Sequence, residues 1–216
     1  MAAVTISRRT PLGHDYASAS VDRPEFWSAP GLSHAHDLAG TAAEPTVRLF
    51  DLTTCDRFGL KGAGSRAWLA GQGLAIPAAI NTWCATPGHD LDVLRLGGED
   101  LVVLSRPGTP SGSPSALRTL WKAEGGMRKG YDAWRDESWA WFHLCGSGLT
   151  TLMAMTCPVD LQPHGFGLHA IVQTRVAQMD CIVVRSDRTG LPGFDLFFDV
   201  ASSAFMLASL KELGSA

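Results

Sequence analysis

The densest group of reactive side chains in the sequence is a cysteine, an aspartate and two histidines within thirteen positions. Cys157, Asp160, His164 and His169 are the residue types of a nucleophilic site, in which a base activates a thiol. Cys157 directly precedes Pro158, where an apolar helix is expected to end, and spacing alone does not bring these groups together. We therefore interpret the group as structural, with the Asp160 carboxylate fixing a turn, and assign no catalytic residue.

A glycine-rich stretch between an expected strand and an expected helix could bind a nucleotide. Residues 62–67 read GAGSRA, which fits the pattern GxGxxA, and backbone amides at such a turn can bind a pyrophosphate. The context argues against this, because no apolar strand ending in an acidic residue follows about twenty positions later. The sequence favours a tight strand-to-helix turn that is used twice, since Gly146-Ser147-Gly148 occupies the matching place. We assign no cofactor-binding residue to this chain.

The sequence gives little support for metal ligation or disulfide bonding. His34 and His36 supply too few ligands for a metal site, and His14, His89 and His143 show no partner at a recognisable spacing. The number of cysteines is odd and no CxxC pair occurs, which argues against a disulfide framework and a structural zinc site. We expect no metal-binding residue and interpret the cysteines as small buried side chains. They are Cys55, Cys84, Cys145, Cys157 and Cys181.

Composition and charge exclude several classes of protein. The chain has 216 residues, of which 45% are hydrophobic, and a net charge of −3. These values fit a folded chain and give no electrostatic reason to bind nucleic acid. No apolar run approaches the roughly 20 residues that span a bilayer, and no apolar segment follows the arginines near the N-terminus. We expect a cytoplasmic protein that binds neither a membrane nor nucleic acid.

The sequence repeats itself. Residues 58–70 (FGLKGAGSRAWLA) and residues 142–154 (FHLCGSGLTTLMA) align at an offset of 84. A second pair of segments, DVLR at residues 92–95 and IVVR at residues 182–185, aligns at an offset of 90. Two similar segments in the same order predict two copies of one supersecondary unit.

The pattern of elements predicts an α+β fold with an internal duplication. Each half reads as strand, helix, two or three strands, helix, which favours mostly antiparallel sheets with helices packed on one face. Phe58 and Phe142, and likewise Gly62 and Gly146, should then occupy equivalent sites. The expected strands are 47–52, 57–60, 76–83, 92–96, 101–104, 138–146, 170–177, 181–185 and 194–198, and the expected helices are 65–72, 116–123, one from about 148, and 200–213. The expected organisation is an N-terminal arm at residues 1–45, a first half at 46–124 and a second half at 125–216.

Two features indicate a chain that partners cover. Trp134, Trp139 and Trp141 lie within eight positions, and tryptophan is enriched at the centres of interfaces as well as in cores. Residues 1–45 lack clear periodicity, so we interpret them as an extended arm that a neighbour orders. When isolated, the chain is expected to form a homo-oligomer or to aggregate.

The most specific likeness to a known family lies in the segment CPVDLQPHGFGLHAIVQT at residues 157–174. With weaker likeness over most of residues 47–210, the sequence resembles the gamma subunit of heterotetrameric sarcosine oxidase. Gln162 departs from the pattern, since a histidine is expected there. The weaker matching segments are residues 10–14, 57–69 and 94–104.

The resemblance implies a function that no motif supplies by itself. It implies an accessory subunit, in a complex with alpha, beta and delta subunits that oxidises sarcosine or a related N-methyl amine. It also implies that FAD, FMN, NAD and tetrahydrofolate belong to the partner subunits, and that the one-carbon unit passes to tetrahydrofolate. The family is related to the folate-binding T-protein of the glycine cleavage system, which implies one compact T-protein-like domain and would explain the two similar halves.

Two alternatives stay open. The first is a free-standing folate-dependent aminomethyl or methyl transferase, which would need an acidic residue at the pterin, and the chain is shorter than such enzymes. The second is a non-enzymatic small-molecule-binding protein. Neighbouring genes for a flavin amine oxidase and a short zinc-binding subunit would favour the accessory subunit over both.

Overall fold

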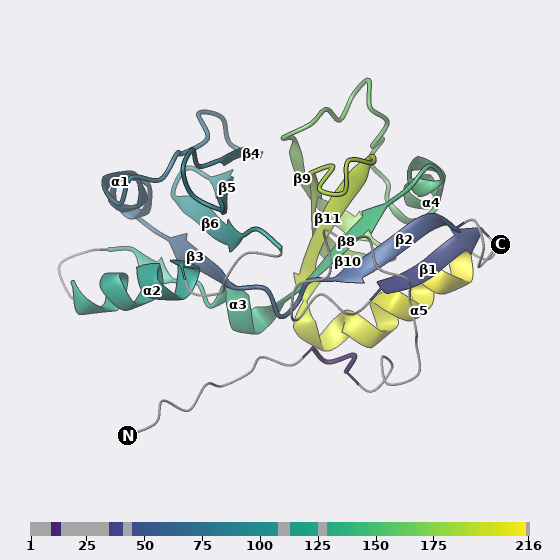
Figure 1. Ribbon diagram of the computed structural model, residues 1–216, viewed down its shortest axis with the longest axis horizontal. Helices are drawn as coiled ribbons and strands as arrows, with labels where there is room; N and C mark the ends of the chain where they lie inside the picture. Colours follow the sequence, from purple (N-terminus) through teal and green to yellow (C-terminus); the bar gives the residue numbers. More distant parts are fainter. Residues whose placement is uncertain (1–9, 14–34, 41–44, 108–112, 125–128, 215–216) are drawn as a thin grey trace.

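Two β-sheets face each other, and helices cover the outer face of each, so the fold has four layers (Figure 1). The computed structural model describes residues 10–13, 35–40, 45–107, 113–124 and 129–214. Within these ranges both sheets are antiparallel. The predicted α+β class is confirmed.

The strands of the described residues form a large sheet and a small sheet. The large sheet consists of β1 (Ala35–Gly40), β2 (Pro45–Asp51), β8 (Trp139–Cys145), β9 (Ile171–Val176), β10 (Met179–Arg185) and β11 (Gly193–Asp199). The small sheet consists of β3 (Arg57–Lys61), β4 (Thr82–Ala85), β5 (Leu91–Gly97), β6 (Asp100–Ser105) and β7 (Tyr131–Asp132). The helices are α1 (Ser65–Gly71), α2 (Ser113–Ala123), α3 (Arg135–Ser138), α4 (Leu149–Thr156) and α5 (Ser203–Gly214), with the 3₁₀ turn η3 (Val200–Ser202) directly before α5.

The two sheets are built from the same succession of elements. In the first repeat β3, α1, β4, β5, β6 and α2 follow one another, and in the second β8, α4, β9, β10, β11 and α5 do so. The four shared strands have the matching orders β4-β5-β6-β3 and β9-β10-β11-β8. The predicted duplication is therefore present in the topology, with three strands after the first helix of each repeat.

The strand registers reproduce both offsets found in the sequence. Phe58 lies opposite Val103 and Phe142 lies opposite Leu196 in the equivalent strand pairs. Val93 lies opposite Val103 in the β5–β6 pair, and Val183, which is 90 positions after Val93, lies opposite Leu196 in the β10–β11 pair. Phe58 and Phe142 are thus equivalent, as predicted.

Each repeat turns from its first strand into its first helix at a glycine. The backbone angle φ is 100° at Gly62 and 132° at Gly146, a region that glycine enters without the steric cost of a side chain. The N–H of Gly62 donates to the Glu99 carbonyl, and that of Gly146 donates to the Pro192 carbonyl. Since each acceptor lies just before the last strand of its repeat, the same turn is used twice.

The strand that precedes each repeat pairs with the other repeat. β2 precedes β3 in the chain but bonds to β8, whereas β7 precedes β8 but bonds to β3. The pairings are equivalent, because Arg48 lies opposite Cys145 and Tyr131 lies opposite Lys61, which is 84 positions before Cys145. In Figure 1 the chain accordingly crosses from β2, beside β8, to β3 on the other side of the molecule. We call this arrangement the strand exchange.

The strand exchange alters the grouping of strands expected from the sequence. The boundary at residue 46 assigned β2 to the first half, yet β2 joins the sheet of the second because Val47 enters its core. β1, expected to be part of the arm, pairs with β2, and Leu12 is buried in the same core. The division into an arm and two halves stays a proposal. Of the arm, residues 1–9, 14–34 and 41–44 lie outside the described residues.

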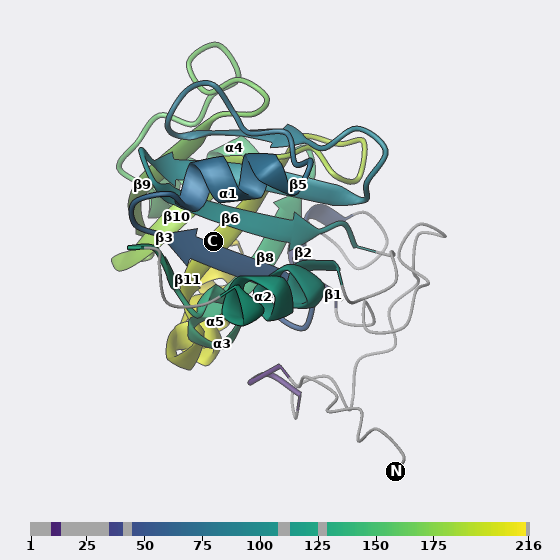
Figure 2. The same cartoon turned by 90° about the vertical axis from the view of Figure 1, so that its left-hand side faces the viewer.

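Three hydrophobic clusters hold the layers together. The first lies between the large sheet and helices α4 and α5, where Met153 and Leu210 are buried. The second lies between the small sheet and helices α1 and α2, where the rings of Trp68 and Trp121 are 5.0 Å apart. The third fills the space between the sheets and includes Trp141. Figure 2 shows α1 and α2 lying over the small sheet.

Candidate functional site

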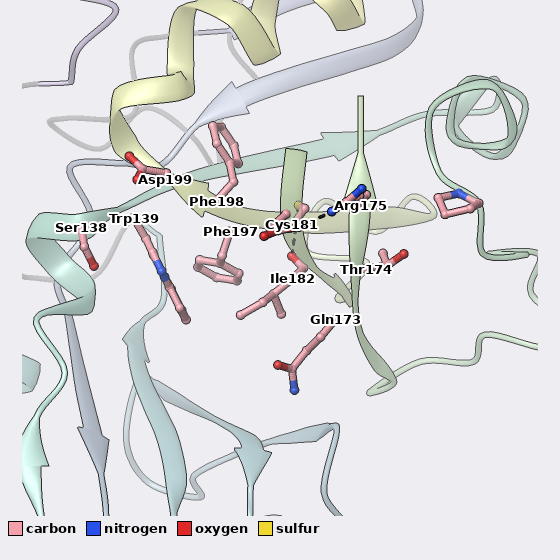
Figure 3. Close-up of a pocket in the computed structure, with 12 residues that line it drawn as sticks. Ser138, Trp139, Gln173, Thr174, Arg175, Cys181, Ile182, Phe197, Phe198 and Asp199 are labelled. Atoms are coloured by element: carbon pink, nitrogen blue, oxygen red, sulfur yellow. Dashed lines mark hydrogen bonds and ion pairs between the residues drawn. The ribbon is translucent and has the colours of Figure 1, made fainter. Parts of the chain in front are cut away.

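A groove of about 810 Å³ opens at one end of the large sheet, and we call it the strand-end groove (Figure 3). It lies where β8 and β10 begin and where β9 and β11 end. Neighbouring strands of the sheet run in opposite directions, so these four ends meet on one side. Apart from Ser138 of α3, the residues that line the groove belong to the second repeat.

The floor of the groove is apolar. Ile182 lies opposite Phe197 in the β10–β11 pair, and the Phe197 and Trp139 rings are 5.9 Å apart. The Arg135 guanidinium lies 3.9 Å from the centre of the Trp139 ring, a cation–π contact that fixes the indole. Phe197 is 1% exposed, whereas Ile182 and Trp139 are half-buried, so burial of these two side chains by a ligand or partner would be favourable.

Three charged side chains border the groove. Arg175 Nε lies 3.2 Å from Asp180 Oδ1 across β9 and β10, and both side chains are largely exposed. Asp199 lies opposite Trp139 at the end of β11, and its Oδ1 accepts the N–H of Ala201 at 2.8 Å. The Trp139 end of the groove thus carries the Asp199 carboxylate and the Arg135 guanidinium.

One polar side chain connects the groove to the small sheet. Gln173 Nε2 donates to the Leu96 carbonyl at 2.8 Å and to Asn81 Oδ1 at 2.9 Å. Asn81 has a φ of 59°, which an asparagine tolerates better than most residues. These bonds hold β9 against β5 and the segment before β4, and so fix the wall of the groove that Gln173 forms.

A buried charge network lies deeper between the sheets. Arg188, in the loop between β10 and β11, donates to Asp92 of β5 at 2.8 Å and to Asp195 of β11 at 2.7 Å. Asp195 Oδ1 is also 2.9 Å from His143 Nδ1, and Asp92 also accepts from Arg106 at 3.0 Å. Arg188 thus joins a carboxylate of the first repeat to one of the second.

The network shifts the pKa values of its members. Burial raises the pKa of the Asp195 carboxyl, but the charges and hydrogen bonds of Arg188 and His143 together outweigh burial and hold this pKa at about 2. Burial lowers the pKa of Arg188, and the two carboxylates outweigh it and raise the pKa above its usual value. Burial also lowers the pKa of His143, but hydrogen bonds to Asp195 and Cys145 outweigh it, so that this pKa is raised. Asp195 and Arg188 are therefore both ionised at neutral pH.

The network includes a cysteine, a histidine and an aspartate in the arrangement of a nucleophilic site. Burial raises the pKa of the Cys145 thiol, but its hydrogen bonds to His143 and Thr189 and the nearby charges together outweigh burial and lower this pKa. However, Cys145 is 3% exposed, and His143 and Asp195 are fully buried. The thiol is therefore sheltered from solvent, and its neighbour Asp195 is joined through Arg188 to Asp92 of the small sheet.

The reactive group singled out in the sequence is dispersed. Cys157 directly follows α4 and is buried in the first hydrophobic cluster. The side chains of Asp160 and His164 are 64% and 77% exposed and lie 3.6 Å apart. The His169 ring contacts the Trp83 ring of β4 in a tilted arrangement, with the ring centres 4.5 Å apart. Asp160 Oδ1 accepts the N–H two residues further on at 2.9 Å, which is the predicted turn interaction.

The glycine-rich turn at residues 62–67 holds a carboxylate of the protein itself. The N–H of Arg66 donates to Glu99 Oε2 at 3.0 Å, and the N–H of Gly62 donates to the Glu99 carbonyl at 2.8 Å. Glu99 thus occupies the place at the start of α1 where a phosphate would bind. This arrangement favours the structural interpretation of the turn.

The described residues contain neither a cluster of metal-ligating side chains nor a membrane-spanning helix. His36 lies in β1, and His34 lies outside the described residues. Among the residues that the structure describes, no group of three or more His, Cys, Asp or Glu side chains is placed to hold a metal ion. Within the same residues, no helix is long and apolar enough to cross a membrane. All five cysteines are free thiols, three of them buried and two half-buried.

The three clustered tryptophans have different surroundings. Trp141 is fully buried between the sheets, and Trp139 forms part of the groove floor. Trp134 is 52% exposed, with the Lys122 ammonium 4.7 Å from its ring centre. Trp134 and Trp139 therefore remain candidates for partner contacts, and Trp141 belongs to the core.

The sequence interpretation missed the charge network. Asp195 stands inside the apolar strand FDLFF, and a carboxylate at such a position needs a buried partner, so this was a usable signal. Nothing in the sequence indicates that its partner Arg188 also binds Asp92, which is 96 positions away. His143 lies two positions from Cys145, a spacing too common in strands to indicate a contact.

Comparison with known proteins supports one family. The sequence is 24% identical over 172 residues to sarcosine oxidase subunit gamma of Corynebacterium sp. (strain U-96), covering 77% of this chain and 80% of that protein. The structure matches a chain of the heterotetrameric sarcosine oxidase from Corynebacterium sp. U-96, with a TM-score of 0.66 and 22% identity over 97% of each chain. This chain has a sarcosine oxidase subunit fold. The resemblance to the gamma subunit expected from the sequence is confirmed.

A more distant similarity links this sarcosine oxidase-like fold to a second protein. The glycine cleavage system aminomethyltransferase T from Bartonella henselae matches with a TM-score of 0.55 and 16% identity. The match covers 75% of this chain but 44% of the aminomethyltransferase. The expected T-protein-like fold is therefore supported for part of that larger protein. No protein-family model matches the sequence.

Proposed function

We propose that this chain is an accessory subunit of a sarcosine-oxidase-type complex, which oxidises sarcosine or a related N-methyl amine and passes the one-carbon unit to tetrahydrofolate. The observation that carries the proposal is the structural match over 97% of this chain and 97% of the oxidase chain. With a match of this extent, both chains present the same set of elements to their surroundings. A shared place in an assembly requires such a correspondence.

The surfaces of the chain fit a supporting role. The reactive side chains that the fold brings together, Cys145, His143 and Asp195, are at most 3% exposed. They stabilise the junction of the sheets and do not meet a substrate. The strand-end groove and the exposed Trp134 offer apolar surface, which is the kind that a partner subunit covers.

In the proposed complex, alpha, beta and delta subunits surround this chain. These partners bind FAD, FMN, NAD and tetrahydrofolate, and this chain contributes no catalytic residue and no ligand to a cofactor or metal. The complex is assigned to the cytoplasm. These assignments follow from the family resemblance and are part of the proposal.

The proposal is tested by purifying the tagged chain from its native host, expressed from its own locus. We expect the purified material to show flavin absorbance and oxygen consumption that depends on sarcosine or another N-methyl amine. Added tetrahydrofolate should be converted to its one-carbon derivative. The same chain expressed alone is the control and should be colourless and inactive. Tagged chain that is stable but carries no flavin-containing partner contradicts the proposal.

The similarity to an aminomethyltransferase favours a second candidate, a free-standing folate-dependent transferase. The chain alone would then transfer a methyl or aminomethyl group to tetrahydrofolate. The remaining alternative, a small-molecule-binding protein, predicts that the chain alone binds sarcosine or tetrahydrofolate by calorimetry without turnover. The control sample of the purification experiment distinguishes all three.

A further inference from the structure

The large sheet has two edge strands, β1 and β9. The edge formed by β9 lies beside the strand-end groove. Antiparallel pairing alternates, so that successive residues direct their backbone N–H and C=O groups to the neighbouring strand and away from it. The carbonyl of Ala170 accepts the N–H of Arg185 in β10, so the even-numbered residues of β9 face β10. Gln173 and Arg175 therefore direct their backbone groups outward.

This edge is closed at both ends and open in its middle. The N–H of Ile171 donates to the Asn81 carbonyl at 2.9 Å, and the N–H of Ala177 donates to the Thr156 carbonyl at 2.9 Å. Between them, no described residue forms a backbone hydrogen bond with the outward groups of Gln173 and Arg175. Two donors and two acceptors remain, at the spacing of roughly 7 Å that alternate residues of a strand have.

The open edge is continuous with the strand-end groove. Gln173 and Arg175 line the groove, and its apolar floor of Ile182 and Phe197 lies on the adjoining strands (Figure 3). A chain that pairs with β9 would direct alternate side chains into this groove.

We propose that β9 and the strand-end groove bind an extended segment of a partner subunit, which adds a strand to the large sheet. The segment presents an apolar side chain to the floor beside Ile182. The repeated donors and acceptors of the edge match an extended backbone better than a compact small molecule. The inference rests on the proposed function, because it takes its partner from the complex described above.

The backbone contact is tested with Arg175→Pro, compared with Arg175→Ala as the matched control. Proline removes the outward N–H but leaves the bonds of β9 to β10, and the preceding residue is already extended. Alanine removes the same exposed side chain and keeps the N–H. Both variants should melt within a few degrees of the native chain. In the tagged purification from the native host, we expect Arg175→Pro to reduce recovery of the flavin subunit about tenfold, whereas Arg175→Ala should change it less than about twofold.

Hydrogen–deuterium exchange supplies a second readout. In the free chain the amides of Gln173 and Arg175 should exchange quickly, and in the purified complex they should be protected. The amides of Val172 and Thr174 bond to β10 and serve as internal controls, protected in both states. A complex that leaves the outward amides unprotected overturns the inference.

The outcomes separate this inference from the proposed function. If the native chain recovers no flavin subunit, the proposed function fails before β9 is tested. If the native chain and Arg175→Pro recover equal amounts, only the docking inference fails. A homodimer of the free chain that Arg175→Pro abolishes would make a second copy the occupant of the edge and would overturn the heteromeric assignment.

Discussion

The two repeats share one topology but differ in what they bury between the sheets. In the second repeat His143 lies opposite Asp195, whereas the equivalent pair of the first repeat is Gly59 opposite Val102. The first repeat contributes Asp92 to the network, from another strand. The two repeats thus keep one backbone arrangement with different residues at equivalent positions, and Arg188 makes a buried charge contact across their junction.

The largest expected effect comes from separating the repeats. Fragments 1–124 and 125–216 should each fail to unfold cooperatively, because each lacks a strand that its sheet needs. β2 lies in the first fragment but pairs with β8 in the second, and β7 lies in the second but pairs with β3 in the first. Each fragment also exposes the cluster between the sheets. Circular dichroism during heating checks this. The two fragments expressed together should regain a cooperative transition, and a fragment that melts cooperatively alone would refute the structural importance of the strand exchange.

The charge that joins the repeats should have the next largest effect. Arg188→Met leaves Asp92 and Asp195 buried without their shared partner, and we expect a loss of about 3–5 kcal/mol of unfolding free energy. Arg106→Met is the control, because the Arg106 side chain is 35% exposed and Asp92 keeps Arg188. It should cost less than about 1 kcal/mol. Urea unfolding measures both free energies. Similar losses for the two variants would show that the shared contact of Arg188 with Asp92 and Asp195 adds no more stability than the Arg106 contact.

The two equivalent turns should tolerate a side chain to different degrees. A Cβ at Gly62 would lie 2.9 Å from the Lys129 carbonyl oxygen, and one at Gly146 would lie 2.2 Å from that of Thr46. We expect Gly62→Ala to cost about 1–3 kcal/mol and Gly146→Ala to cost at least about 1 kcal/mol more. Gly64→Ala isolates the backbone term, since its φ is positive but no atom lies within 4 Å. Equal losses at Gly62 and Gly146 would contradict the difference in packing.

The smallest expected effect is a dependence on pH that only the second repeat contributes. The pKa of Asp195 is about 2 in the folded chain against an ordinary 3.8, so its contribution is present above about pH 4 and is lost as the pH falls towards 2. The raised pKa of His143 acts in the opposite direction, because its contribution is present below about pH 6.5 and lost as the pH rises.

Between about pH 4 and pH 2, the native chain should therefore lose about 2 kcal/mol more stability than Asp195→Asn. Denaturant unfolding across this range measures the difference. Parallel acid profiles for the two proteins would show that Asp195 makes no such contribution. Val102→Asn, at the equivalent position of the first repeat, is the control for introducing an amide.

Elements with a clear apolar pattern were predictable from the sequence, and pairings between distant segments were not. The strand expected at residues 76–83 shortens to Thr82–Ala85, because Arg95 donates to the carbonyls of Pro77 and Ala78 and holds that segment as a loop. β7 has two residues, too few to show a period. Its pairing depends on Lys61, 70 positions earlier, and local patterns contain no such information.

The groove and the charge network were beyond prediction for the same reason. Each depends on side chains that are unremarkable in sequence, such as Ile182 and Arg188, and that meet only after the sheets pack. The glycine turn was predictable, because Gly62 and Gly146 mark a local conformation. The exposed positions of Asp160 and His164 could not be read from their spacing, since the loop that carries them follows no repeating pattern.

The strand exchange also sets an order of events during synthesis. β2 ends at Asp51, and its partner β8 begins at Trp139. The ribosome must therefore add about ninety residues before the pair can form. At bacterial and eukaryotic elongation rates this takes roughly 4–18 s. During that time the hairpin of β1 and β2 keeps one edge and one apolar face uncovered. The large sheet is therefore completed only after β11, which ends at Asp199, has been synthesised, and until β8 pairs with it β2 offers an open edge to a chaperone that binds extended apolar segments.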